Sequence, residues 1–224
     1  MAMDSIEDAL TALARGEMVV VLDDKGRENE GDLIIAAEHA TPAALAFIVR
    51  HTTGIVCVAL ECERADALQL DPMVQANDDR HGTAFTVSVD ARKGTTTGVS
   101  AADRATTIAA LVDPATQPHD LMRPGHLFPL RARPGGVLER PGHTEAAVDL
   151  ARLAGCAPAG VLCEVVSDDG SMARTPELIR FARAHGLCIV TIADLIVYRR
   201  EGRDRRPSVH AFPTEPGLEA GAMR

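Results

Sequence analysis

The sequence predicts an α+β fold, a single domain in which helices surround a mixed β-sheet. Segments with the apolar spacing of helices are interspersed with short apolar runs typical of buried strands. The two kinds of segment do not alternate strictly, as they would around a parallel α/β sheet. No internal repeat, low-complexity tract or linker divides the 224 residues, and this length can bury one substantial core.

The expected helices begin and end at residues with capping chemistry. Asp4 or Ser5 can cap the first helix, and Thr41 followed by Pro42 opens the second. Ser100 with Asp103 three residues later is a capping box for the fourth. The expected helices cover residues 4–15, 41–50, 61–69, 100–112, 144–154, 175–185 and 191–200.

Apolar runs between these helices predict the strands of the sheet. The run 84–89 alternates like a half-buried strand. Two segments without periodicity, 71–82 and 113–126, are expected to be a mobile surface loop and an irregular connection. The catalytic domain is expected over 1–200, followed by a disordered tail over 201–224. The expected strands cover residues 18–22, 33–37, 55–60, 84–89, 127–132, 160–166 and 187–191.

Composition excludes several classes of function. The net charge is −9, with one Tyr and no Trp, whereas nucleic-acid binding requires a basic surface and stacking aromatic residues. No stretch approaches the ~18 consecutive apolar residues of a membrane span, and the acidic N-terminus does not resemble a secretory signal. The five cysteines form no C-x-x-C pair, so we expect reduced thiols in a cytoplasmic protein.

The stretch 23–32 has more charge than a turn requires. Five carboxylates and two cations lie between two apolar strand candidates. Hard cations such as Mg²⁺ prefer carboxylate oxygens and keep water molecules that a substrate can displace. The side chains with suitable chemistry are Glu28, Glu30 and Asp32, with Arg27 to balance charge or hold an anion. The alternative interpretation is a solvated, charged hairpin.

A second polar cluster, Arg140–Glu145, stands at a predicted helix start. Arg140 offers a fork of donors for phosphate, and the helix N-terminus adds N–H groups beside the Thr144 hydroxyl. His143 can ligate a metal or act as a base. The alternative is that Thr144 only caps the helix while the Arg and His are solvated.

Two isolated residues and one loop have weaker signals. His126 lies in the irregular segment, where it can be a general base near neutral pH or simply a surface residue. Glu164 interrupts an apolar strand. Burial on both faces would raise its pKa unless it is paired, but one-sided exposure is the alternative. The loop Thr95–Thr97 precedes a capped helix and can hold an anion.

Taken together, these segments resemble the 3,4-dihydroxy-2-butanone 4-phosphate synthases of riboflavin biosynthesis. The matching motifs run in order and extend over roughly residues 5–200. They are Asp23-Asp24-x-x-Arg27-Glu28-Asn29-Glu30-Gly31-Asp32, Thr96-Thr97-Gly98-Val99-Ser100-Ala101-Ala102-Asp103-Arg104, Arg123-Pro124-Gly125-His126, Gly142-His143-Thr144-Glu145 and Gly160-Val161-Leu162-Cys163-Glu164.

The resemblance implies a Mg²⁺- or Mn²⁺-dependent homodimeric lyase that converts D-ribulose 5-phosphate to formate and L-3,4-dihydroxy-2-butanone 4-phosphate, with active sites close to the subunit interface. The implied metal ligands are Glu28 and His143. The implied catalytic residues are His126, Glu164 and Asp32. The implied substrate contacts are Arg27, Glu28, Asp32, Thr96, Thr97, Arg140, Pro141, Gly142, His143, Thr144 and Glu164.

Some positions depart from the family pattern. His81-Gly82-Thr83-Ala84 stands where Tyr-Gly-Thr-Gly is expected, and Thr95 and Pro141 replace Val and Gly. In many relatives a GTP cyclohydrolase II domain follows, but the 25 or so polar residues here are too few to form one. We therefore expect the monofunctional form. Two other functions stay open: a non-catalytic sugar-phosphate- or metal-binding relative, and another Mg²⁺-dependent sugar-phosphate lyase.

Overall fold

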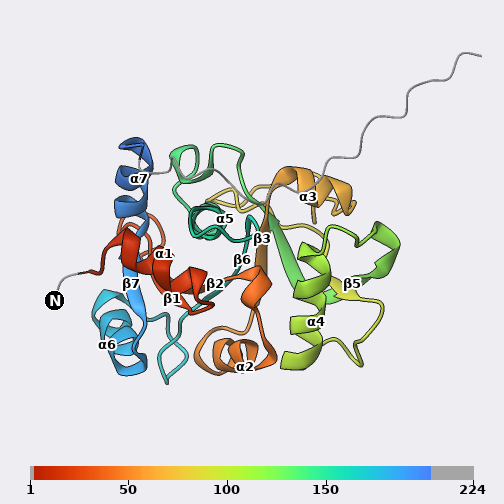
Figure 1. Cartoon of the computed structure of the whole chain (residues 1–224), viewed down its shortest axis with the longest axis horizontal. Helices are drawn as coiled ribbons and strands as arrows, with labels where there is room; N and C mark the ends of the chain where they lie inside the picture. The colour runs from red at the N-terminus through yellow and green to blue at the C-terminus, as the bar shows by residue number, and fades with distance from the viewer. Residues whose placement is uncertain (1–2, 203–224) are drawn as a thin grey trace, which may run out of the picture.

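A computed structural model describes residues 3–202 of the chain (Figure 1). The helices are α1 (Ile6–Ala14), α2 (Pro42–His51), α3 (Cys62–Ala67), α4 (Ala101–Val112), α5 (His143–Leu153), α6 (Thr175–His185) and α7 (Ile192–Arg200), with short 3₁₀ turns η1 (Ala37–His39), η2 (Pro118–Asp120) and η3 (Gly136–Leu138). The strands are β1 (Val19–Leu22), β2 (Gly31–Ala36), β3 (Cys57–Leu60), β4 (Val89–Ala91), β5 (Leu121–Arg131), β6 (Ala159–Glu164) and β7 (Cys188–Thr191).

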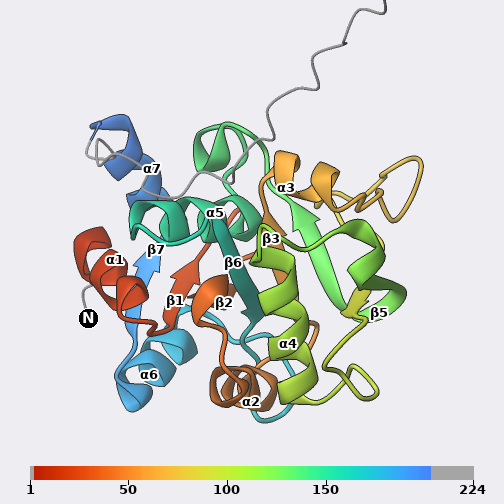
Figure 2. The ribbon, with the colours of Figure 1, turned by 45° about the vertical axis from the view of Figure 1, so that its right-hand side comes forward.

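The strands form one mixed sheet in the order β4-β5-β3-β6-β2-β1-β7. The pairs β1–β7 and β3–β5 are parallel, and the remaining neighbours are antiparallel. Helices cover both faces, with α5 and α7 on one side and α2 and α6 on the other (Figures 1 and 2). The predicted α+β class with a mixed sheet is therefore confirmed.

The sheet has a hydrophobic core on each face. Alternate residues such as Leu33 and Val161 pack against α2, α4 and α6, whereas Ile34 and Leu162 pack against α1, α5 and α7. Central strands are consequently buried on both faces, which explains why they appear in the sequence as continuous apolar runs. The one-sided exposure considered for the strand that contains Glu164 is wrong, because Ala159–Cys163 are all buried.

Two strand predictions need correction. Residues 84–88 form only isolated bridges, Phe85 with Leu130 and Thr86 with Pro72, and the strand beside β5 begins only at Val89 and runs to Ala91. The segment 113–126 is not irregular throughout, because β5 already begins at Leu121. Its Pro and Gly residues are tolerated because this part of β5 pairs with the edge strand β4 across a register shift.

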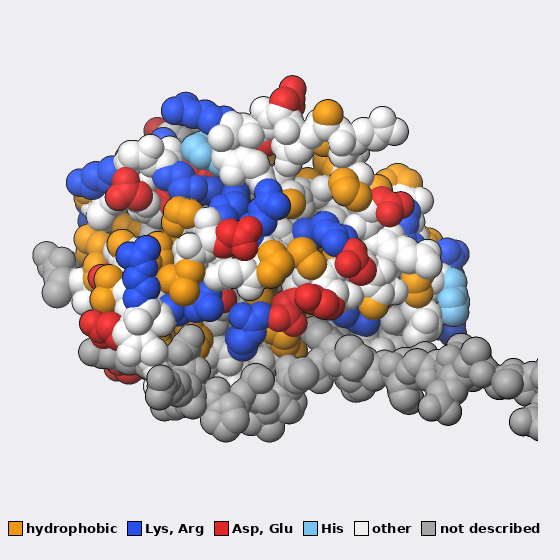
Figure 3. All heavy atoms as spheres, turned by 90° about the horizontal axis from the view of Figure 1, so that it is seen from above, with side chains coloured by type: hydrophobic (Ala, Val, Ile, Leu, Met, Phe, Trp, Pro, Cys, Tyr) orange, Lys and Arg blue, Asp and Glu red, His pale blue; other side chains and the backbone are white. Residues whose placement is uncertain are grey.

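Other expectations concern the surface. Residues 71–80 are exposed, in agreement with a surface loop, although mobility stays a prediction. All five cysteines are free thiols. Within residues 3–202, no helix has the length and apolar character needed to cross a membrane. Charges of both signs are interspersed on the face seen in Figure 3. The predicted tail lies outside the described residues from residue 203 onward.

Candidate active site

The acidic loop between β1 and β2 is organised by the carboxylate of Asp23. This carboxylate accepts the backbone N–H groups of Glu28 and Glu30, both at 2.9 Å, and the Arg27 guanidinium at 3.1 Å. Asn29 takes the left-handed conformation at φ 56°, which Asn tolerates better than most residues. The loop is therefore not a solvated hairpin: Asp23, which had no assigned role from sequence, holds Arg27 and Glu28 in place.

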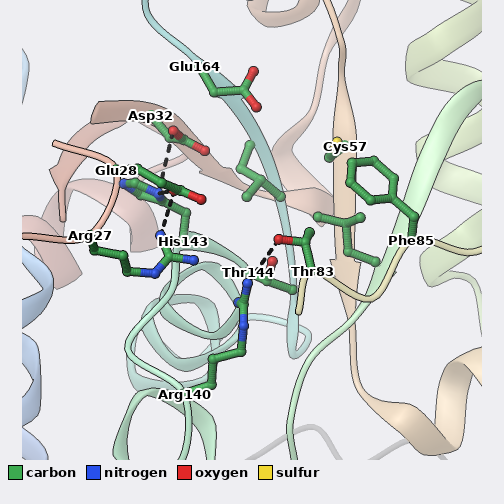
Figure 4. A pocket seen from close by; sticks show the side chains of 12 residues that line it. Arg27, Glu28, Asp32, Cys57, Thr83, Phe85, Arg140, His143, Thr144 and Glu164 are labelled. Carbon is green, nitrogen blue, oxygen red and sulfur yellow. Dashed lines mark hydrogen bonds and ion pairs between the residues drawn. The ribbon is translucent and has the colours of Figure 1, made fainter. Parts of the chain in front are cut away.

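His143, the first residue of α5, lies between two carboxylates from β2 and its preceding loop (Figure 4). Its Nδ1 is 3.7 Å from Glu28 Oε2 and 3.7 Å from Asp32 Oδ1, distances that fit ion pairs rather than hydrogen bonds. Its Nε2 is 3.0 Å from the Val21 carbonyl oxygen. Because a carbonyl only accepts, Nε2 carries a hydrogen, and the lone pair of the neutral ring is on Nδ1.

Electrostatics of this cluster are dominated by negative charge. The interaction with the His143 imidazole, with help from Arg27, outweighs burial and lowers the pKa of Glu28 to about 2. Burial alone would lower the pKa of His143, but Asp32 and Glu28 reverse this and raise it to about 9. Burial raises the pKa of Asp32 to about 7. Glu28 is therefore ionised, and Asp32 can gain or lose a proton near neutral pH.

The chemistry of these donors fits a hard divalent cation. Asp32 Oδ1 is buried and has no hydrogen-bond partner among the described residues. His143 Nδ1 points toward this carboxylate and toward that of Glu28. One potential ligand atom from each of Asp23, Glu28 and His143 lies within 4.8 Å of the others. A bound cation would supply the missing partner of this buried oxygen and would accept the lone pair of the nearby imidazole nitrogen.

A second group of potential ligands, Glu38, His39 and Cys156, satisfies the same distance limit. It is less suited to a hard divalent cation, because one of its three ligand atoms is a thiol sulfur. In addition, burial raises the pKa of the Cys156 thiol to about 11, which disfavours the thiolate that binds metals.

The carboxylate–histidine cluster opens into a pocket of about 190 Å³. Its lining combines polar residues from the acidic loop and the start of α5 with apolar residues of the sheet. The lining residues are Arg27, Glu28, Asp32, Cys57, Thr83, Phe85, Leu130, Arg140, His143, Thr144, Leu162 and Glu164. Two sequence segments more than 100 residues apart are thus brought together, as the resemblance implies.

Two arginines converge beside the start of α5. A Cβ at Gly142 would lie 2.3 Å from Arg140 Nη1 and 3.1 Å from Arg27 Nη2, so glycine leaves room for both guanidinium groups. Arg140 is held by buried Glu145 at 2.6 Å. Gly142 is the helix N-cap and has no side chain to occupy the first N–H groups. The solvated alternative for Arg140 and His143 is therefore wrong, and this corner favours an anion.

The segment before β4 completes the fixation of Arg140. Arg140 Nε donates to the His81 carbonyl at 3.0 Å, and Arg140 Nη2 donates to the Thr83 hydroxyl at 2.9 Å. The departure at His81 therefore leaves this backbone contact intact. Thr83 and Phe85 were not among the predicted site residues, although Thr83 belongs to the stretch His81-Gly82-Thr83-Ala84 that departs from the family pattern.

Glu164 ends β6 directly opposite Asp32 on β2. Its Oε2 accepts a hydrogen bond from the Thr53 hydroxyl at 2.7 Å. Glu164 thus lines the pocket, as predicted, with its carboxylate oriented by a residue that the sequence did not indicate.

Five predicted residues do not line this pocket: His126, Thr96, Thr97, Pro141 and Gly142, of which Gly142 lies beside the lining residue Arg140. His126 contacts Asp90, with Nδ1 2.7 Å from Oδ2. The N–H and hydroxyl of Thr96 both donate to Asp103. Thr97 and Pro141 are exposed.

These observations describe a pocket at the ends of central sheet strands, lined by side chains that could hold a divalent cation and an anionic ligand. The comparisons with known proteins are specific. Residues 7–198 match the 3,4-dihydroxy-2-butanone 4-phosphate synthase family. The chain therefore belongs to the 3,4-dihydroxy-2-butanone 4-phosphate synthase family.

Among curated relatives, the riboflavin biosynthesis protein RibBA of Salinispora arenicola is 61% identical over 196 residues, which are 88% of this chain and 47% of that protein. RibBA of Mycobacterium tuberculosis is 57% identical over 96% of this chain and 52% of its own length. The chain thus spans about half the length of these relatives.

Solved structures agree with the fold. A 3,4-dihydroxy-2-butanone 4-phosphate synthase in complex with two magnesium ions matches with a TM-score of 0.87 and 48% identity, over 91% of this chain and all of the other. The Candida albicans synthase matches with a TM-score of 0.83 and 50% identity, over 89% of this chain and 99% of that one.

Proposed function

We propose that this chain converts D-ribulose 5-phosphate to formate and L-3,4-dihydroxy-2-butanone 4-phosphate with Mg²⁺ or Mn²⁺. The observation that carries the proposal is the carboxylate–histidine cluster beside two arginines that line the same pocket, one of which, Arg27, pairs with Glu28. It provides for a metal and for a phosphate group in the same cavity. Family membership and the magnesium-bound solved relative support the same assignment.

Glu28 and His143 would hold the metal. When bound, a divalent ion acts as a Lewis acid that polarises the sugar oxygens next to the carbonyl. The protein contributes orientation: Asp23 holds the Glu28 backbone, and the Val21 carbonyl holds the His143 ring with Nδ1 toward the carboxylates. His143→Ala should weaken metal binding, so that little activity remains at Mg²⁺ concentrations that saturate the wild-type protein.

The phosphate would occupy the corner formed by Arg140, Arg27 and the start of α5. Free helix N–H groups, the Thr144 hydroxyl and two guanidinium groups favour an anion there. Because the phosphate does not react, its binding energy serves to fix the sugar carbons.

Proton transfers would be divided among Asp32, Glu164 and His126. The reaction removes a proton next to a ketone, eliminates water, migrates a carbon, adds water back and releases C4 as formate, so several groups must exchange protons. The pKa of Asp32, raised to about 7 by burial, suits both accepting and donating. His126→Ala or Glu164→Ala should abolish turnover while ribulose 5-phosphate still binds. Near-normal formate release by either variant contradicts its role.

A homodimer would bring His126 to a pocket. His126 lies two residues before Phe128, which pairs with Cys57. Glu164 lies two residues after Leu162, which also pairs with Cys57, and Asp32 pairs with Glu164. The three residues are therefore level with one another across the sheet. Three strand spacings nonetheless separate His126 from Asp32, about 14 Å. We propose that the partner's His126 completes each pocket, with exposed Ile55 within the contact.

Mixing two inactive variants tests this arrangement. A His126→Ala chain and a His143→Ala chain are unfolded together and refolded. The mixture should regain about a quarter of wild-type activity if each site takes His143 from one subunit and His126 from the other. This follows because half the dimers are mixed and each has one intact site. Recovery no greater than that of the separate variants contradicts a shared site.

One assay separates this function from the alternatives. The protein is incubated with ribulose 5-phosphate and Mg²⁺, and formate and the four-carbon phosphate are measured by NMR. Equal amounts of both products are expected. Binding without turnover would indicate a non-catalytic relative, and another product would indicate a different lyase. The monofunctional form and the cytoplasmic location stay predictions.

A further inference from the structure

Both carboxylate oxygens of Asp90 on β4 contact His126 on β5. Oδ2 lies 2.7 Å from His126 Nδ1, and Oδ1 accepts the His126 backbone N–H at 2.9 Å. The Asp90 side chain is 5% exposed, whereas that of His126 is 46% exposed. A buried carboxylate thus holds the inner edge of a half-exposed ring.

The backbone around this pair is shaped to fit it. The register of β4 and β5 shifts between Val89 and Asp90, and this irregularity redirects the Asp90 side chain. Gly98 has φ +86°, and a Cβ there would lie 2.1 Å from Asp90 Oδ2 and 2.7 Å from His126 Nδ1. The chain can therefore cover the contact only because residue 98 lacks a side chain.

We propose that Asp90 is a positioning residue that fixes the tautomer and orientation of His126. The ionised carboxylate can only accept, so Nδ1 carries the hydrogen in the neutral ring and Nε2 keeps its lone pair. Nε2 has no hydrogen-bond partner among the described residues and is left available as a base. When Nε2 takes a proton from substrate, the imidazolium that forms is stabilised by Asp90. This role rests on the proposed function of His126.

Asp90→Asn tests the proposal sharply because the backbone dictates how the amide sits. The His126 N–H requires an acceptor, which keeps the Asn oxygen at the position of Oδ1. The amide NH₂ then faces Nδ1 and donates to it. The ring must place its hydrogen on Nε2, and the base is lost although the packing is kept. Serine proteases lose activity by the same exchange of tautomer.

The tautomer is measured directly by two-bond ¹H–¹⁵N NMR on histidine-labelled protein. The neutral wild-type His126 is expected as Nδ1–H, and Asp90→Asn is expected to convert it to Nε2–H. His126→Ala identifies the signal. A wild-type Nε2–H tautomer, or no change in Asp90→Asn, overturns the proposal. The NMR measurement needs no substrate, so its result does not depend on whether the proposed function is correct.

Kinetics test the consequence for turnover. Asp90→Asn should lower kcat about 10²-fold or more with little change in KM, as expected for loss of general base catalysis. Asp149→Asn is the control, because it also neutralises a buried carboxylate that accepts a backbone N–H outside the pocket. Asp149 also pairs with Arg152 and Arg199, so circular dichroism first verifies that this variant is folded. Retained kcat in Asp90→Asn, or an equal loss in Asp149→Asn, contradicts a positioning role.

Discussion

Glu164 owes its orientation to a hydroxyl group. The Thr53 side chain donates to its carboxylate at 2.7 Å, and the Thr53 N–H donates to its carbonyl. Thr53→Val should lower kcat about tenfold, the equivalent of one hydrogen bond to a charged group. Thr53→Ser keeps the hydroxyl and should retain most activity. The comparison is made by steady-state kinetics, and equal activity of the two variants argues against this role.

Single residues were predictable where they belong to a local motif. Glu28, His143 and Glu164 stand in contiguous stretches that resemble the family, and the structure brings them to one pocket. Thr53 and Asp90 were missed because their partners are 111 and 36 residues away, and a short polar residue beside a strand gives no local signal.

At the scale of elements, the proposed function assigns both metal binding and phosphate binding to the start of α5. Gly142→Ala should push the Arg140 guanidinium away from this corner, because its Cβ would approach Nη1 to 2.3 Å. KM for ribulose 5-phosphate should rise about tenfold, since the displaced guanidinium loses a hydrogen bond to the charged phosphate, worth about 1.5–3 kcal/mol. Pro141→Ala, at the exposed neighbouring position, should leave KM near the wild-type value. An unchanged KM in Gly142→Ala contradicts phosphate binding at this corner.

Elements with regular apolar runs were predicted well, and those at the sheet edge were not. The strands 18–22 and 33–37 correspond to β1 and β2, because burial on both faces demands continuous apolar residues. The start of β5 has Pro124 and Gly125, and its exposed side chains give no strand period. Conversely, the alternating segment 84–89 makes only isolated bridges before Val89, since local alternation does not ensure a full ladder.

At the scale of the molecule, Asp4 ties the N-terminal segment to α6 and β7. Its carboxylate pairs with Arg183 at 2.8 Å and accepts the Ile189 N–H at 2.8 Å. The bond to Arg183 lowers the pKa of Asp4 below its ordinary value. A depressed folded-state pKa contributes stability above the unfolded pKa, near 3.8, and loses it as pH falls through the folded value.

Asp4→Asn should therefore lower the Tm at pH 7, and its difference from wild type should shrink as the pH falls below about 4. The Tm is followed by circular dichroism from pH 7 to pH 2. Asp78→Asn, on the exposed loop 71–82, serves as the control. A difference that persists unchanged at pH 2 contradicts the ionic origin of this contribution.

The central claim is that the acidic loop and the start of α5 form one metal-dependent lyase site. It is tested most directly with ribulose 5-phosphate labelled with ¹³C at C4. Wild-type protein with Mg²⁺ should release the label as ¹³C-formate, and His143→Ala at the same Mg²⁺ concentration should release far less. Label retained in a five-carbon product, or formate released equally by both proteins, would contradict the claim.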